Sequence, residues 1–167
     1  MKTTEIEIDV TYKGTNARFT FTTGDDWEEA ILDFVNDEAG FNNTDDFEEI
    51  TDLSELTYEI IDWGEVDDYE NLHDIDVLNE IAETSDLEYY DWEVISAALY
   101  CDVQISDISE AYQGQYKDDA DFAENLCTEV GDIPSNLPSY IYIDWERTAN
   151  DIMMDYSESD GYYFRRL

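Results

Sequence analysis

The chain has 167 residues, of which 45 are Asp or Glu and seven are Lys or Arg, so its formal net charge is −38. This balance excludes binding to nucleic acids or anionic membranes through a basic patch, because such affinity depends on Lys and Arg that neutralise phosphates. Apolar residues make up 43% of the chain and aromatic residues 14%, whereas disordered acidic tracts are poor in the residues that build a core. The sequence therefore predicts a folded protein.

In chain order, the first predicted elements are two strands of a hairpin. Apolar and polar residues alternate over residues 6–12 and again over 17–22, and residues 13–16 are typical of a turn. A third strand is predicted over 57–63 from its β-prone composition. Together with the helix that follows the hairpin, these strands predict a small α+β domain over residues 1–63.

A helix is predicted directly after the hairpin. Its apolar residues follow the spacing of one helix face; they are Trp27, Ala30, Ile31, Phe34 and Val35. Asp25 or Asp26 is expected to cap its first turn, and Gly40 to end it. Residues 41–52 are predicted to form a polar, acidic loop.

The middle of the chain, residues 64–112, is predicted to be a helical domain. Helical spacing recurs over 74–83 and over 106–112. Between them, the segment Ser85–Glu88 fits a capping box ahead of a helix that carries Trp92, Ile95 and Leu99 on one face.

Residues 113–167 are predicted to form a second α+β domain. A helix is expected over 121–130, with Phe122, Leu126 and Val130 directed inward, and another over 144–153. Strands at 153–156 and 162–165 are expected to form a terminal hairpin around the turn signal Asp160-Gly161. The predicted fold class is thus α+β and elongated, with three small units in a row.

The sequence offers little for catalysis or metal binding. His73 is the one histidine and is expected at the surface or at a helix cap, so imidazole metal sites and a Ser-His-Asp set are not supported. The loop after Asp155 fails the calcium pattern, because Gly and Glu do not fall at its sixth and twelfth positions. Cys101 and Cys127 are expected to be buried free thiols. We expect no enzyme activity, no cofactor and no metal.

The distribution of charge is more informative. Between Phe19 and Tyr116 the chain runs 98 residues without a Lys or Arg and holds 30 Asp and Glu residues. Such a density of like charge opposes folding through self-repulsion, which favours a working surface over an accident of composition. Adaptation to high salt would spread the acids evenly, whereas here the cations are gathered toward the two ends; they are Lys2, Lys13, Arg18, Lys117, Arg147, Arg165 and Arg166.

The sign and density of this charge resemble those of a nucleic-acid backbone. Duplex DNA carries roughly one charge per 1.7 Å of its axis, so 38 net charges correspond to about 65 Å of duplex. A compact globule of this length is only about 30–35 Å across. Mimicry of DNA therefore requires an elongated body, which three units in a row or a dimer would supply.

The last third of the chain carries specific motifs. Residues 108–116 read ISEAYQGQY and residues 121–124 read DFAE, and downstream come Ile133-Pro134, IDWE at 143–146, ANDI at 149–152 and DGYYF at 160–164. These resemble the runs EAYxGxY…DFAE and IPxxLxxYIDYExxARDL and the C-terminal strand of the ArdA antirestriction family. Three departures are the longer YIYID run at 140–144, an N-terminal strand without the family's usual opening, and Asn150, which stands where the family usually has Arg and removes that Arg as a partner for an ion pair.

The resemblance implies an elongated, three-domain, non-enzymatic protein that forms a homodimer through its C-terminal domain, residues 113–167. It implies a mimic of bent DNA that occupies the DNA groove of type I restriction-modification enzymes, on their specificity and methyltransferase subunits. Family members are encoded by plasmids, transposons and phages, so we expect a location in the cytoplasm of a bacterial host. No direct binding of nucleic acid and no membrane contact are expected.

The candidate interface residues follow from this interpretation. Dimer contacts are expected around Tyr140, Tyr142 and Trp145, with core packing as the alternative role. The DNA-mimic carboxylates are expected in the loop and the middle of the chain, and for each of them a solvated surface acid is the alternative; they are Asp45, Asp46, Glu48, Glu49, Asp62, Glu65, Asp67, Asp68, Glu70, Asp74 and Asp76.

Two other functions remain open from the sequence. The chain could inhibit a different DNA-binding defence protein or a nucleoid protein through the same charge. It could also be an acidic metal-buffering module, for which loose cation sites at 67–70 and 74–76 are the candidates.

Overall fold

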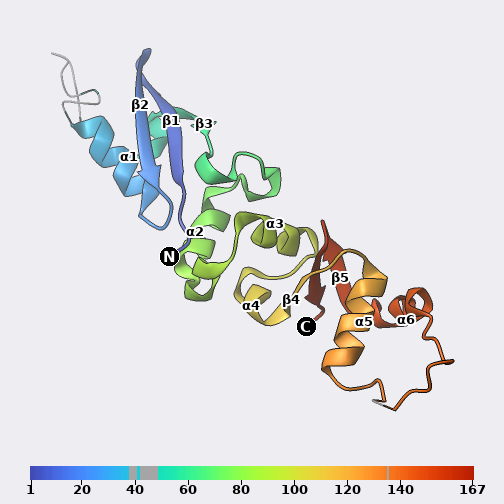
Figure 1. The fold of residues 1–167 in the computed structure, drawn as a ribbon. Coiled ribbons are helices and arrows are strands. Elements are labelled where there is room, and N and C mark those ends of the chain that lie inside the picture. Colours follow the sequence, from blue (N-terminus) through green and yellow to red (C-terminus); the bar gives the residue numbers. More distant parts are fainter. Residues whose placement is uncertain (38–40, 42–48, 135) are drawn as a thin grey trace. The chain divides into compact units, whose positions relative to one another are not determined.

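The structure is a computed structural model that describes residues 1–37, 41, 49–134 and 136–167. They form two compact units, an N-terminal unit, Met1–Trp92, and a C-terminal unit, Glu93–Leu167. Each unit holds one three-stranded sheet together with helices (Figure 1). The predicted α+β class is thereby confirmed, while the three-domain division at residues 63 and 112 and the elongated arrangement stay predictions.

The sheet of the N-terminal unit has the order β2-β1-β3 and is antiparallel throughout. Its strands are β1 (Glu5–Tyr12), β2 (Thr15–Thr22) and β3 (Thr57–Asp62). The apolar residues that alternate in the sequence all lie on one face of the sheet, because successive side chains of a strand point to opposite faces. Ile6, Ile8 and Val10 of the central strand are fully buried. The predicted turn at 13–16 is shorter in the structure, because Tyr12 already pairs with Thr15.

Helix α1 (Trp27–Asn36) packs on the sheet beside β2 (Figure 1). Asp26, rather than Asp25, is its N-cap, and its side chain accepts a hydrogen bond of 3.1 Å from Glu29 N. Phe34 stacks on Phe19 of β2 with ring centroids 4.6 Å apart. The predicted helix stop at Gly40 lies outside the described residues.

The predicted polar loop over 41–52 is wrong in one respect, since it supplies core residues. Phe41 and Ile50 are 2% and 1% exposed. The amide of Asn36, at the end of α1, holds the backbone of Ile50 through hydrogen bonds of 2.8 and 2.9 Å. Single apolar residues in an acidic stretch carry no periodicity, so their burial could not be predicted from the sequence.

The rest of the N-terminal unit is helical. It consists of 3-10 helices η1 (Leu53–Glu55), η2 (Gly64–Val66), η3 (Glu70–Leu72) and η4 (Ser85–Tyr89) and of helix α2 (Ile75–Glu83). The predicted capping box at Ser85–Glu88 is wrong: the segment is η4, and the Ser85 hydroxyl donates to the Asp86 side chain instead of accepting a hydrogen bond from a backbone N–H of a helix. Helix α3 (Trp92–Tyr100) starts three residues after η4 ends.

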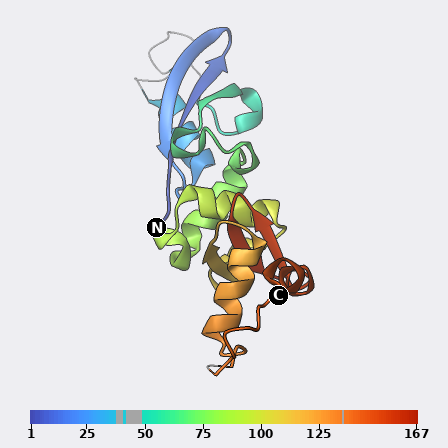
Figure 2. The same cartoon turned by 45° about the vertical axis from the view of Figure 1, so that its right-hand side comes forward.

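The C-terminal unit places helices against a sheet of order β4-β6-β5 (Figure 2). After α3 come η5 (Ile105–Asp107), α4 (Ile108–Ala111), β4 (Tyr112–Gln115), α5 (Asp119–Glu129), α6 (Trp145–Ile152), β5 (Tyr156–Ser159) and β6 (Tyr162–Arg165). Strand β4 was not expected from the sequence, because four residues that include a glycine give too short a pattern to recognise.

Two expectations for this unit are corrected. The hairpin exists, but its first strand is β5 and not 153–156, because Met153 and Asp155 still hydrogen-bond back to the end of α6. Phe122 is buried as expected, whereas Val130 lies just beyond α5 and is 61% exposed. Among the described residues, none of the helices has both the length and the apolar character needed to cross a membrane.

Candidate acidic interface

Eight of the predicted mimic carboxylates belong to the described residues, and all eight are exposed. Asp45, Asp46 and Glu48 lie outside the described residues. The exposed eight all belong to the N-terminal unit, and seven of them fall within residues 62–76, here called the acidic segment; the eight are Glu49, Asp62, Glu65, Asp67, Asp68, Glu70, Asp74 and Asp76.

The acidic segment is fixed from within by two apolar side chains. Val66 and Leu72 are both fully buried. Tight backbone hydrogen bonds of 2.8 Å join Tyr69 N to Val66 O and Leu72 N to Tyr69 O. The 3-10 turns η2 and η3 therefore point their apolar residues into the core and leave the carboxylates between them in solvent.

The start of the segment is joined to strand β1. The hydroxyl of the buried Thr4 accepts a hydrogen bond of 2.8 Å from Glu65 N and donates one of 3.3 Å to Trp63 O. Gly64 has φ +63, and a Cβ there would collide with the backbone oxygen of Glu5 and with Thr4 Oγ1. Only glycine allows the chain to approach β1 this closely.

Several carboxylates of the segment also have structural roles. Asp62 Oδ1 accepts a hydrogen bond of 2.6 Å from Gly64 N. Asp74 is the N-cap of α2 and accepts from Asp76 N and Val77 N at 2.9 and 3.2 Å. For Asp62 and Asp74 a structural role therefore accompanies any role in recognition. No hydrogen bond or ion pair of Asp67, Asp68 or Glu70 side chains occurs among the described residues.

An aromatic pair supports the same segment. The ring of His73 stacks on Trp63, with centroids 4.7 Å apart and planes 5° apart, and His73 Nε2 lies 3.1 Å from Val66 O. The histidine is half-buried at the C-cap of η3, which agrees with the expected capping position. Its contacts give it a structural role in holding the turn.

Glu65 is held by a residue far along the chain. Trp92 Nε1 donates a hydrogen bond of 2.9 Å to Glu65 Oε2. The ring of Trp92 also contacts a cation, since Lys2 Nζ lies over it at 4.7 Å from its centroid. Sequence reasoning missed the roles of Thr4 and Trp92, because both depend on segments that only the fold brings together.

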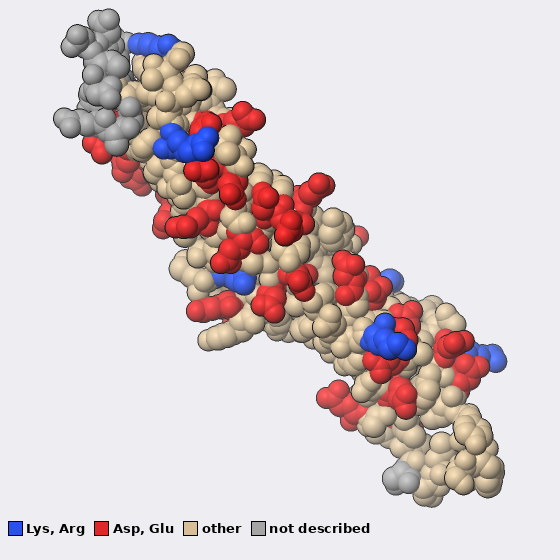
Figure 3. Space-filling model, turned by 45° about the horizontal axis from the view of Figure 1, so that its top comes forward, with Lys and Arg blue, Asp and Glu red and all other residues tan. Residues whose placement is uncertain are grey.

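Few cations offset the acids of this unit. The N-terminal unit has 29 Asp and Glu residues against three Lys and Arg. Arg18 lies 2.7 Å from Asp9 and 3.6 Å from Glu7, and its hydrogen bond lowers the pKa of the Asp9 carboxyl. In the part of the chain that the structure describes, no Lys or Arg forms an ion pair with any of the eight candidate acids. On the face drawn in Figure 3, acidic side chains accordingly far outnumber basic ones over this unit.

The C-terminal unit is less acidic, with 16 Asp and Glu residues against four Lys and Arg. Of the predicted dimer residues, Tyr140 and Tyr142 are 77% and 88% exposed, and Trp145 is half-buried at the first residue of α6. Core packing is thus not the role of the two tyrosines within the described chain. The same unit has a groove of about 420 Å³ whose lining includes Leu126 of α5 and Ile152 of α6 together with the polar side chains of Thr148 and Asp151.

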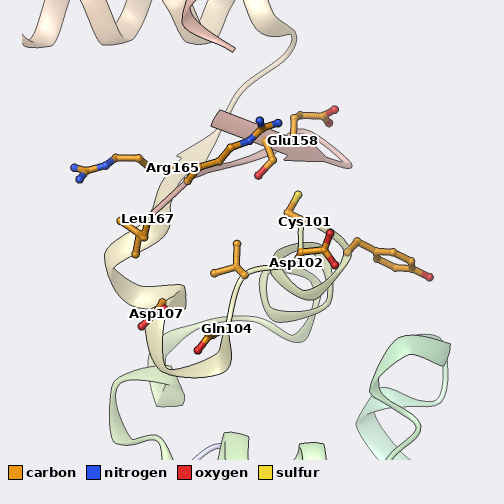
Figure 4. Close-up of a pocket in the computed structure, with 11 residues that line it drawn as sticks. Cys101, Asp102, Gln104, Asp107, Glu158, Arg165 and Leu167 are labelled. Atoms are coloured by element: carbon orange, nitrogen blue, oxygen red, sulfur yellow. The ribbon is translucent and has the colours of Figure 1, made fainter. Parts of the chain in front are cut away.

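A cavity of about 500 Å³ in the C-terminal unit holds the Cys101 thiol (Figure 4). Arg165 and Glu158 lie across it from Asp102. Cys101 and Cys127 are free, as expected, but half-buried rather than fully buried. Burial raises the pKa of the Cys101 thiol, which disfavours the reactive thiolate. Among the described residues, no group of three or more His, Cys, Asp and Glu is arranged to hold a metal ion.

Comparison with known proteins agrees with the motifs of the sequence. A family model described as antirestriction protein (ArdA) matches residues 21–164, which is most of the chain and covers the larger part of each unit. Neither the curated proteins nor the solved structures gave a match. The match extends upstream of the motifs at 108–164 and includes the whole acidic segment.

Proposed function

Because the chain belongs to the ArdA antirestriction family, we propose that it is a DNA mimic that occupies the DNA-binding groove of type I restriction-modification enzymes. Membership in the family implies an antirestriction function. In this proposal the inhibition is non-enzymatic, and it protects incoming DNA in the cytoplasm of a bacterial host. The partner surface is the DNA groove formed by the specificity and methyltransferase subunits.

The proposal rests on one observation, namely that the acidic segment holds exposed carboxylates without cationic partners, in the described part of the chain, on a fixed backbone. Its carboxylates are exposed, they form no ion pairs with Lys or Arg among the described residues, and they stand on a backbone fixed by Val66, Leu72 and Thr4. Carboxylates on a backbone that is already ordered need less further ordering when a basic groove closes on them. Their mutual repulsion in the free protein is relieved when the cations of a partner arrive.

The C-terminal unit supports a homodimer in this proposal. Tyr140 and Tyr142 are exposed in a unit with a lower density of acids, so two copies can approach there with less repulsion than through the N-terminal units. A dimer would present two acidic units to one enzyme. Solution scattering tests the required shape: an elongated dimer is expected, and a compact sphere would contradict the proposal because its charges could not follow a duplex.

The direct test is binding to a purified type I enzyme in competition with duplex DNA. We expect the protein to displace the DNA, and its affinity to fall steeply between about 50 and 200 mM salt, as it does for polyanions that bind basic grooves. An affinity that does not change with salt would rule out electrostatic mimicry. Displacement of DNA from a nucleoid protein, with no effect on the restriction enzyme, would favour an inhibitor of another DNA-binding protein.

A further inference from the structure

The side chain of Tyr89, at the end of η4, is unusual for an aromatic residue in the N-terminal unit. It is 88% exposed, and among the described residues it takes part in no hydrogen bond and no ring contact. Its backbone is fixed by the core, because Leu87, two residues earlier, is fully buried and accepts a hydrogen bond of 3.1 Å from Tyr90 N. The ring is thus presented to solvent from an ordered turn.

The surroundings of this ring attract cations. Asp86 and Asp91 flank it in the chain, both are exposed, and neither forms an ion pair among the described residues. The same short stretch already binds two cations of this chain, since the ammonium of Met1 lies 3.0 Å from Glu88 Oε2 and Lys2 Nζ lies over the ring of Trp92. An aromatic face in such a negative field favours a cationic occupant over an apolar one.

A ring face adds something that carboxylates alone do not provide. Carboxylates attract Lys and Arg through charge, in the way that phosphates do. A planar guanidinium can also stack on an aromatic ring, and it gives up its hydration more readily than an ammonium does. An acidic surface that includes Tyr89 therefore distinguishes arginine from lysine.

We propose that Tyr89, with Asp86 and Asp91, forms a binding surface for an arginine side chain of the DNA-binding partner. The inference rests on the proposed function, since it takes the partner to present a basic surface. It adds a stacking contact to the charge mimicry, and it places that contact outside the acidic segment. Tyrosine and arginine, together with tryptophan, are also enriched among the residues that dominate binding energy at protein interfaces.

The test is an NMR titration of the full chain with tetra-arginine and, separately, with tetra-lysine. The ring signals of Tyr89 are identified by their loss in a Tyr89→Phe variant. We expect these signals to shift with tetra-arginine, with a half-saturating concentration about two- to fivefold lower than with tetra-lysine, as expected for cation–π contacts at exposed sites. Equal half-saturation by the two peptides, or ring signals that stay in place while other parts of the surface saturate, would overturn the proposal.

Variants of Tyr89 distinguish the contribution of its aromatic ring from that of the neighbouring carboxylates. Tyr89→Phe keeps the aromatic face and should retain the arginine preference at the amides of Asp86 and Asp91, whereas Tyr89→Leu should lose it. Both changes are at a solvent-exposed position, so folding should be maintained. Tyr142→Leu is the control, since Tyr142 is equally exposed but belongs to the C-terminal unit; loss of the preference in this variant as well would refute a specific role for Tyr89.

A failure of the arginine contact can be distinguished from a failure of the proposed function. If the wild-type protein fails to displace DNA from a type I enzyme, the mimicry proposal fails whatever the peptides show. If it displaces DNA and Tyr89→Leu does so with unchanged affinity, the mimicry stands and the arginine contact is wrong. If Tyr89→Leu weakens the complex by about two- to fivefold while Tyr89→Phe does not, the arginine contact is supported.

Discussion

Trp92 Nε1 donates a hydrogen bond of 2.9 Å to Oε2 of Glu65, and so connects the start of α3 to the acidic segment 27 residues earlier. The indole is 7% exposed, whereas Glu65 is exposed. A buried donor thus fixes the position of a surface carboxylate. The same tryptophan carries Lys2 on its ring face, so one side chain organises both an anion and a cation.

Removing this donor should loosen the acidic segment. We expect Trp92→Phe to lower the free energy of unfolding by about 1 kcal/mol, beyond any effect of the smaller ring, because the bond to the carboxylate is lost. Urea denaturation measures the change. Glu65→Gln is the matched control, since it keeps an oxygen acceptor without the charge, and it should cost less. Equal losses in the two variants would show that the charge, and not the hydrogen bond, provides the stability.

The close approach at Gly64 gives a second prediction. Gly64→Ala should destabilise the protein by at least about 2 kcal/mol, because a Cβ at φ +63 would collide with the backbone of Glu5 and with Thr4 Oγ1. Gly14→Ala is the control: its φ is +85 but nothing lies within 4 Å of the added Cβ, so only the backbone strain of about 1 kcal/mol applies. Thermal unfolding of the two variants should differ accordingly, and equal shifts would contradict the packing argument.

Neutralising a block of the acidic segment should weaken inhibition. In the triple variant Asp67→Asn, Asp68→Asn, Glu70→Gln, three exposed charges are removed that bind no Lys or Arg among the described residues. We expect the affinity for the type I enzyme to fall about tenfold, with single changes having little effect. Competition with labelled duplex DNA measures it.

The matched control for that block lies in the C-terminal unit. Glu124→Gln, Glu129→Gln, Asp132→Asn also removes three exposed charges and should change the affinity much less. If the two blocks weaken inhibition equally, net charge alone matters and the acidic segment has no special role.

The dimer proposal predicts a change of molar mass. A Tyr140→Ser, Tyr142→Ser double variant should shift the protein from a dimer toward the 19.5 kDa monomer in light scattering. Both side chains are exposed in the single chain, so the monomer should remain folded. Tyr100→Ser, at another exposed tyrosine of the same unit, should leave the mass unchanged. A double variant with the mass of the wild type would exclude these tyrosines as the contact.

Stability at high pH should depend on Tyr163. Burial and a hydrogen bond of 2.8 Å to Asp119 raise the pKa of this tyrosine above its usual value of about 10. Above that pH the unfolded chain loses the Tyr163 proton while the folded chain keeps it, so the free energy of unfolding falls as the pH rises. Below the usual value this penalty is absent.

Tyr163→Phe tests that account. The variant keeps the ring that stacks on Phe122 with centroids 4.5 Å apart and removes the titrating group. We expect it to cost about 1 kcal/mol at neutral pH and to show a shallower loss of stability above pH ~10. The pKa of Tyr116 is also raised by burial, so the variant should still lose some stability as the pH rises. Identical slopes would show that Tyr163 does not contribute to alkaline unfolding.

Much of the fold, and the exposure of the candidate acids, could be predicted from patterns in the sequence. Periodicity located α1, α2 and the first hairpin, because each of these buries one regular face, and α5 and α6 were also expected close to where the structure has them. The motifs at 108–164 indicated the family, the charge count indicated an acidic working surface, and each described candidate acid is exposed. Many like charges repel one another and are tolerated only where solvent screens them, so the exposure of such acids can be predicted from composition alone.

The contacts that hold those acids became visible in the folded chain alone. The contacts of Thr4 with Glu65 and of Trp92 with Glu65 join residues 61 and 27 positions apart, and no local pattern records a pairing at such a distance. Phe41, Ile50 and Val130 were misplaced for the same reason, since the burial of a single apolar residue depends on what the fold brings against it. Local regularity is encoded in spacing along the chain, whereas the fixed position of a carboxylate depends on its neighbours in space.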